Sequence, residues 1–226
     1  MKEIRLDIAG TTYREDAIVS LNTHRELFVG YSKTVGNCVF GELNATLTVP
    51  SADIPRNAEI KPYVRDTNGV WVQKSTYFVF SREVDKTTGW VSLTAYDAIF
   101  RAETSFTQSG DQGTWPRTDI NVMQEIAQRT GATISSDSVA KMTNSYAVQY
   151  PGITLSDNTL KPDGRGALTM RDVAGRIASM YGGNWIIDNN GQWCLVCIGD
   201  IPADADYLVT EDSDIIVMGG VRILVK

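Results

Sequence analysis

The stretch that decides the fold class reads Val39-Phe40-Gly41-Glu42-Leu43-Asn44-Ala45-Thr46-Leu47-Thr48-Val49. Its odd positions are apolar or glycine, and its even positions are polar from Glu42 onward. Alternation with a period of two is typical of a strand that buries one face, and Pro50 ends the pattern because proline cannot donate a ladder hydrogen bond. The first half of the chain is therefore predicted to be rich in strands.

Shorter segments on both sides of this stretch carry further strand signals. They are Ile4–Ile8, Ala17–Leu21, Glu59–Arg65, Val70–Gln73, Thr76–Arg82 and Trp90–Ala95. Two turns, Asp66-Thr67-Asn68-Gly69 and Asp188-Asn189-Asn190-Gly191, predict hairpins because Asn and Gly tolerate a positive φ. Neither turn has the closing Glu of a calcium loop, so turn chemistry explains them better than metal binding.

A different pattern occurs twice with the same internal spacing. It reads Thr118-x-x-x-Val122-x-x-x-Ile126-Ala127-x-x-x-Gly131 and Thr169-x-x-x-Val173-x-x-x-Ile177-Ala178-x-x-x-Gly182. Each copy predicts a short amphipathic helix, about Asp119–Thr130 and Met170–Tyr181, capped by its Thr and stopped by its Gly. The repeated positions hold no residue type that usually carries chemistry, which favours a scaffold.

These signals predict an α+β, β-rich protein with β-barrel-like sheets and an α/β middle that contains the two repeat helices. Residues 1–97 would form a β-barrel-like domain, and residues 98–205 an α/β domain with the repeat helices and the hairpin Trp185–Ile198. Residues 206–226 would hold returning strands, including the pair Ile215–Met218 and Val221–Val225, or begin a further β-barrel domain. Between these elements we expect a short helix at Asp97–Glu103 and loops at Ser105–Pro116 and Ser135–Ala167.

The composition narrows the classes of function. The 226 residues carry a net charge of −6, and no run of basic residues is longer than two, so specific nucleic-acid binding is not expected. No stretch approaches the roughly 20 apolar residues that cross a bilayer, and Met1–Arg5 does not lead into a secretory signal. We expect a protein that is made in a cytoplasm and does not insert into a membrane.

The residue types that usually build catalytic, cofactor or metal sites are sparse. Cys194 and Cys197 form a C-x-x-C, but they lie on a predicted strand and would point to opposite faces, so two buried cysteines are favoured over a zinc or redox site. With Cys38 the chain has three cysteines, too few for a disulfide framework. His24 is the only histidine, and it is expected in an exposed connection between strands.

Acidic and glycine-rich segments give no clearer signal. A glycosidase-type carboxylate pair stays open among Glu42, Glu59, Glu83 and Asp85. Gly164-Arg165-Gly166 and Gly182-Gly183 lack the spacing of a phosphate-binding loop. We therefore assign no catalytic, cofactor-binding or metal residue and expect no cofactor.

Five tryptophans raise the alternative of a sugar-binding module, in which exposed rings stack on glycans. They are Trp71, Trp90, Trp115, Trp185 and Trp193. Four lie in or beside predicted strands, where packing is the commoner role. Trp115, in the loop Gly113-Thr114-Trp115-Pro116, is the best candidate for a sugar contact.

Four segments in succession resemble tail proteins of siphophages and prophages of Gram-positive bacteria. They are Asn37–Leu43, Ile54–Ile60, Thr94–Ile99 and Arg171–Asn184. The order and spacing are similar to the N-terminal structural region of the tail-tip hub, also called the tail-associated lysin or tail endopeptidase. That family is similar in fold to the baseplate hub of contractile tails.

The resemblance implies a virion structural protein that trimerises into a ring at the distal end of the tail tube. Such a hub contacts the distal tail protein, the tape measure protein and later the passing DNA. The chain stops at Lys226 without a catalytic appendage, so we expect no lysin activity, and a piece of a longer protein is compatible with this end. A cell-wall hydrolase and a sugar-binding module stay open as alternatives.

Overall fold

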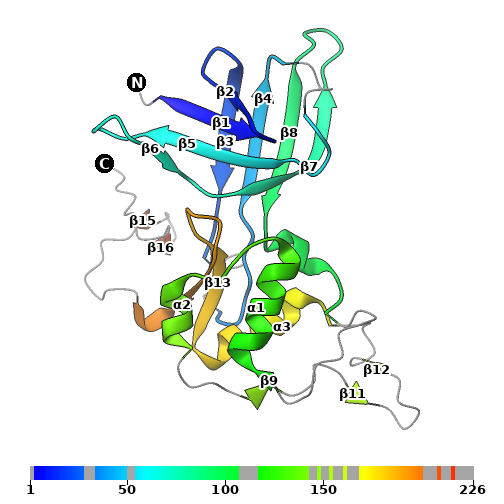
Figure 1. The fold of residues 1–226 in the computed structure, drawn as a ribbon, viewed down its shortest axis with the longest axis vertical. Helices are drawn as coiled ribbons and strands as arrows, with labels where there is room; N and C mark the ends of the chain where they lie inside the picture. Colours follow the sequence, from blue (N-terminus) through cyan, green and yellow to red (C-terminus); the bar gives the residue numbers. More distant parts are fainter. Residues whose placement is uncertain are drawn as a thin grey trace. The chain divides into compact units, whose positions relative to one another are not determined.

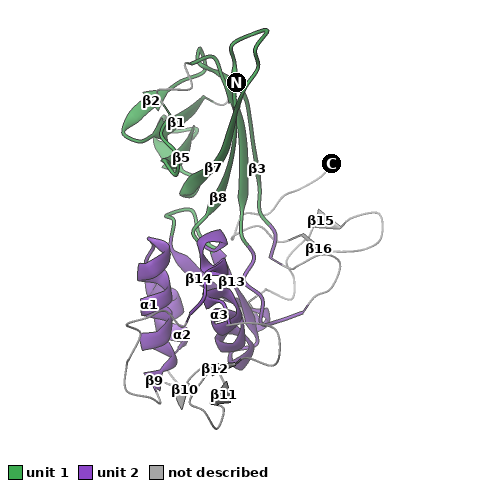
Figure 2. Cartoon of the chain, turned by 90° about the vertical axis from the view of Figure 1, so that its right-hand side faces the viewer, with its two compact units in different colours: residues 1–25, 40–98, 187–191 green, residues 26–39, 99–186, 192–226 purple. Residues whose placement is uncertain are grey.

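The computed structural model describes residues 3–27, 34–49, 54–106, 117–142 and 168–200. It also describes the backbone of the short strands β10 (Ala147–Val148), β11 (Ile153–Thr154), β12 (Leu160–Lys161), β15 (Leu208–Val209) and β16 (Ile215–Ile216). The chain divides into two compact units (Figure 2). Unit 1 comprises residues 1–25, 40–98 and 187–191, and unit 2 comprises residues 26–39, 99–186 and 192–226.

Unit 1 is built on an eight-stranded sheet with antiparallel pairing. Its strands are β1 (Ile4–Ile8), β2 (Thr11–Tyr13), β3 (Ile18–His24), β4 (Glu42–Leu47), β5 (Glu59–Arg65), β6 (Trp71–Gln73), β7 (Tyr77–Val84) and β8 (Val91–Asp97). They follow the order β2-β1-β5-β7-β8-β4-β3, and β6 pairs with β5 (Figure 1).

The alternating stretch Val39–Val49 contains β4, which lies between β8 and β3. Leu43, Ala45 and Leu47 are buried, and they lie opposite the equally buried Ala95, Leu93 and Val91 of β8. The intervening residues of both strands are polar or aromatic and face away from this core. Burying a leucine side chain of this kind stabilises a fold by roughly 1.5–3 kcal/mol, so the alternation fixes the register.

The β-rich α+β class is confirmed. Strands β1 and β5 have the predicted bounds, and the other predicted strands of this sheet are shifted by a few residues. Strand β2 was not predicted, because its three residues are too few for a periodic pattern. The described strands form an open path, in which the terminal strands β2 and β3 do not pair with each other, so no closed barrel is formed among them.

Unit 2 contains both predicted repeat helices, α1 (Asp119–Thr130) and α3 (Met170–Met180). The Thr118 hydroxyl accepts a hydrogen bond from the Asn121 N–H, and Thr169 forms a capping box with Asp172. After the helices Gly131 and Gly182 have φ values of 81° and 63°, in the left-handed region that glycine adopts at little cost. The predicted caps and glycine stops are therefore confirmed.

A small sheet in unit 2 lies against these helices. Its centre is the hairpin of β13 (Gly183–Ile187) and β14 (Trp193–Cys197), extended by parallel bridges from Cys38 to Trp185 and from Ile134 to Trp193. The Trp185 indole N–H donates to the Ala174 carbonyl of α3 at 3.0 Å, and that of Trp193 donates to the Thr130 hydroxyl of α1 at 3.1 Å. Each repeat helix is thus tied to the sheet by a buried indole.

Three predicted elements differ from the structure. Asp97 does not cap a helix, because it is the buried last residue of β8 and accepts the Gly41 N–H, and only a 3₁₀ turn, η2 (Phe100–Glu103), follows. The helix α2 (Ser136–Lys141), capped by Ser135, lies where a loop was predicted. Strand β16 pairs with β15, while residues 221–225 of the predicted C-terminal pair lie outside the described residues.

Two other features complete the fold. The turn η3 (Ile198–Asp200) follows β14. Within the described ranges, none of the helices has the length and apolar character needed to span a bilayer.

Candidate functional site

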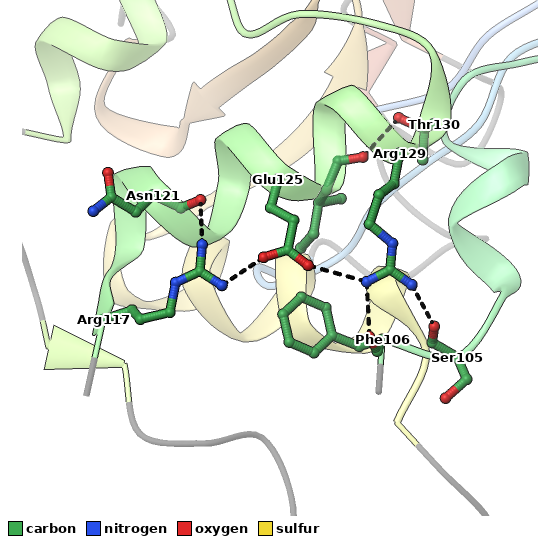
Figure 3. Close-up of polar contacts among 8 residues, drawn as sticks. Ser105, Phe106, Arg117, Asn121, Glu125, Arg129 and Thr130 are labelled. Atoms are coloured by element: carbon green, nitrogen blue, oxygen red, sulfur yellow. Dashed lines mark hydrogen bonds and ion pairs between the residues drawn. The ribbon is translucent and has the colours of Figure 1, made fainter. Parts of the chain in front are cut away.

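A charged cluster on α1 joins polar side chains and backbone groups of unit 2 (Figure 3). Glu125 lies between two arginines: it pairs with Arg117, and its other oxygen lies 3.2 Å from the Arg129 guanidinium. All three side chains are about one-fifth exposed. A partly buried carboxylate between two guanidinium groups forms charge-assisted hydrogen bonds, which are stronger than neutral ones.

Arg129 extends the cluster to the chain that follows η2. Its guanidinium donates to the carbonyls of Phe106 at 2.7 Å and Ser105 at 2.9 Å, and lies 5.6 Å from the centre of the Phe106 ring (Figure 3). Arg117 donates to the Asn121 carbonyl at 3.2 Å, in the first turn of α1. Arg129 therefore anchors Phe106 to α1, and the side chain of Arg117 anchors its own residue to the same helix. The segment 107–116 between these two residues lies outside the described residues.

Backbone pairing joins a second pair of segments to this cluster. The Phe106 N–H donates to the Leu168 carbonyl at 2.9 Å, and the Met170 N–H donates to the Thr104 carbonyl at 3.0 Å. Strand β9 (Arg117–Thr118) pairs with β10. The starts of α1 and α3 thus share one network, which we call the loop platform and define as residues 104–106, 117–118, Glu125, Arg129 and 168–170.

The loop platform can fix the position of the chain segments that begin and end at it, because binding loops are usually supported by a scaffold that holds their ends. It does not combine a nucleophile with a base. In the ranges that the structure describes, no group of three or more His, Cys, Asp or Glu side chains could hold a metal ion. This cluster was not predicted, although the spacing of Glu125 and Arg129 by four residues on a predicted helix was an available signal.

The single histidine and the candidate carboxylates lie on the sheet of unit 1. His24 was predicted in an exposed connection between strands. It is exposed, but it is the last residue of β3 and lies opposite Glu42 of β4. Glu59 pairs with Lys61. Two strands lie between Glu59 of β5 and Glu42 of β4, and the register places Phe78 and Tyr96 between the two carboxylates, so the sheet does not set them side by side.

The other two carboxylates lie at the far end of the β7–β8 hairpin. Glu83 is exposed on β7. Asp85 accepts the N–H groups of Thr87 and Thr88, which lower its pKa, so it is a turn residue. The structure does not bring these groups together with Glu42.

The cysteines belong to unit 2. Cys194 and Cys197 lie on β14, as the strand pattern predicted, but they are half-buried and not buried as expected. Cys38 is buried beside Arg171, and burial raises the pKa of its thiol far above the usual range. A thiol held protonated in this way is a poor nucleophile.

The tryptophans divide by exposure. Trp185 and Trp193 are fully buried, with ring centres 6.0 Å apart, and cannot stack on a sugar. Trp71 is half-buried near Arg5, and Trp90 is exposed. Trp115 and the segment Gly164-Arg165-Gly166 lie outside the described residues, and Gly182-Gly183 joins α3 to β13 without a phosphate-loop geometry.

The fold itself has known counterparts. It is similar to the 43 kDa tail protein of prophage MuSo2 from Shewanella oneidensis, with a TM-score of 0.54 and 14% identity, over 87% of this chain and 53% of that one. It is also similar to a tail protein from Neisseria meningitidis MC58, with a TM-score of 0.54 and 12% identity, over 86% of this chain and 51% of that one. The chain therefore spans about half the length of each tail protein.

At these identities the likeness concerns the fold. No protein-family model matches the sequence, and no curated protein matches it.

Proposed function

We propose that the chain is a non-enzymatic structural component of a phage or prophage tail. The observation that carries this proposal is a fold shared with two tail proteins over 86–87% of the chain. The four sequence segments that resemble tail-tip hubs support the same assignment independently of the fold comparison. The protein would be part of the virion tail after synthesis in the host cytoplasm.

Within the tail we assign it to the tip or baseplate hub, as a ring of three copies at the distal end of the tube. Its partners there would be further copies of itself, the distal tail protein and the tape measure protein. An open sheet with terminal strands suits ring closure between copies, because the edges of strands present unpaired backbone groups. The net charge of −6 suits a passage through which DNA moves without being held.

Light scattering over a concentration series tests the hub assignment, with the chain alone and with a purified ring of distal tail protein. We expect a trimer mass at high concentration or on the ring. A monomer under all these conditions, with no binding to the ring, would overturn the assignment.

The two alternatives have less support and separate tests. A hydrolase requires converging carboxylates, and the two strands between Glu42 and Glu59 weigh against that pair; clearing of a peptidoglycan gel would revive it. A sugar-binding module requires exposed rings, and a change in tryptophan fluorescence on titration with cell-wall glycans would favour it.

A further inference from the structure

Part of one face of the unit 1 sheet, on four of its strands, carries carboxylates and no cation, whereas on the neighbouring β5 the same face continues with both Glu59 and Lys61. On β3, β4, β7 and β8 the residues that alternate with the core residues define what we call the acidic sheet face. They are Ser20, Asn22, His24, Glu42, Asn44, Thr46, Phe78, Phe80, Ser81, Glu83, Ser92, Thr94 and Tyr96. This described set includes two carboxylates and no Lys or Arg. Arg82 of β7 is opposite the core residue Leu93 and donates to the Ile54 carbonyl instead.

Aromatic rings gather at one end of this face. Tyr96 packs edge-on against Phe40, with ring centres 5.3 Å apart. The ring centre of Phe80 lies 5.4 Å from that of Tyr96. Phe80 is 62% exposed. It lies where the pairing of β7 with β8 shifts register between Val79 and Ser81, and a bulge of this kind interrupts the regular ladder of the two strands.

Carboxylates lie on both sides of the rings. The register places Glu42 opposite Tyr96 and Glu59 opposite Phe78, so one row crosses four strands as acid, ring, ring, acid. Glu59 is already paired with Lys61. Glu42 accepts a hydrogen bond from the Asn44 amide and has no cationic partner among the described residues, so its charge is available to a partner.

We propose that the acidic sheet face docks a segment of another protein that carries Lys or Arg beside an apolar residue. A cation held over an aromatic ring is attracted by the ring, and a carboxylate alongside adds an ion pair. The apolar residue would cover Phe80. A nucleic acid does not fit, since its phosphates would meet Glu42 and Glu83.

A second copy docked through the same face is also disfavoured. It would bring like carboxylates together, which is costly at an interface. The basic segment is therefore the occupant whose charge complements the face.

The probe is a short synthetic peptide that alternates arginine and leucine, compared with versions that carry glutamine or glutamate in place of arginine. Calorimetric titration should show binding of the arginine peptide alone, weakened by added salt. Phe80→Ser should weaken it by about fivefold or more, as for a central aromatic contact, and Glu42→Gln by about two- to fivefold. Val70→Ser and Asp16→Asn are matched controls, because both side chains are exposed elsewhere on unit 1, and they should leave the affinity unchanged.

Four results would overturn the proposal: no binding of the arginine peptide, equal binding of the glutamine peptide, equal affinity of the Phe80→Ser variant, or a cell-wall glycan bound through Phe80. Loss of trimer mass in Phe80→Ser alone would instead assign the face to contacts between copies. None of these results bears on whether the chain binds a distal tail protein ring, so the proposed function is judged separately.

Discussion

At the scale of single residues, Arg129 links α1 to the chain that follows η2. Its guanidinium serves Glu125 and two backbone carbonyls that precede residue 107. Removing it would leave a partly buried carboxylate with one cation fewer and two carbonyls without their donor. Leaving a buried donor or acceptor unsatisfied costs more free energy than a typical hydrogen bond contributes to stability.

We therefore expect Arg129→Ala to lower the free energy of unfolding by about 2–3 kcal/mol. Arg176→Ala is the matched control, because Arg176 is exposed on α3, and it should change stability by less than about 0.5 kcal/mol. Urea unfolding followed by tryptophan fluorescence measures both. Equal effects of the two substitutions would contradict the role of the loop platform.

The buried thiol of Cys38 should make the free energy of unfolding depend on pH. Burial, the largest cause, raises its folded pKa, and the nearby Arg171 only partly offsets this. In the unfolded chain a thiol loses its proton near pH 8.5, at about its ordinary pKa, while the folded thiol keeps its proton. Above that pH the unfolded state binds fewer protons than the folded state, so stability falls as the pH rises.

Wild-type protein should therefore lose about 1 kcal/mol more stability between pH 7.5 and 9.5 than Cys38→Ala does. Tyr77, whose pKa is also raised by burial, affects stability only at higher pH, because an unfolded tyrosine titrates near pH 10. Denaturant unfolding at a series of pH values provides the comparison. Parallel curves for the two proteins would rule out the thiol as the cause.

At the scale of elements, close approach of backbones fixes where α3 lies in unit 2. Gly175 is in the middle of this helix, where alanine normally stabilises by about 1 kcal/mol. A Cβ added there would lie 2.4 Å from the Gly36 carbonyl oxygen, far closer than two such atoms can approach. The helix therefore contacts the segment 34–39 through a position that only glycine fits.

Gly175→Ala should accordingly destabilise the protein, by about 1–3 kcal/mol, in the opposite direction from helix propensity. Gly199→Ala provides the control, since nothing lies within 4 Å of a Cβ added at Gly199. Thermal unfolding followed by circular dichroism is sufficient. A raised midpoint for Gly175→Ala would show that α3 moves away from residue 36 at little cost.

The sequence predicts elements where burial leaves a periodic trace. Strand β4 alternates because only one of its faces is buried, and α1 and α3 carry their own caps and stops. Strand β13 is buried at all five positions and has no alternation to read, so its hairpin with β14 was predicted from the turn Asp188–Gly191 instead. The six residues of α2 are too few for a helical period.

Contacts between distant segments left no such trace. The bridge between Cys38 and Trp185 and the bonds from Arg129 to Ser105 and Phe106 depend on how the chain folds back on itself. A single sequence specifies these contacts only through the complete fold. The loop platform was therefore missed, whereas the helix on which it rests was predicted.

At the scale of the whole molecule, charge decides which polymers the protein can hold. A net charge of −6 and the acidic sheet face, whose described residues on β3, β4, β7 and β8 include no Lys or Arg, both oppose the counterion release that drives binding to DNA. The wild-type chain should leave the fluorescence anisotropy of a labelled DNA duplex unchanged even in about 50 mM salt, where electrostatic binding is strong.

Two double variants with the same net charge show whether DNA binding depends on where the charges lie or only on their total. Glu42→Lys with Glu83→Lys places new cations on the acidic sheet face, and Glu15→Lys with Asp16→Lys makes the same change in net charge in the turn before β3. If the face is an extended flat surface that repels phosphate, the first variant should gain salt-sensitive DNA binding and the second much less, because cations on one flat face contact a duplex together. Equal gains would show that net charge alone governs the repulsion, and salt-sensitive binding by the wild-type chain would contradict a surface past which DNA moves freely.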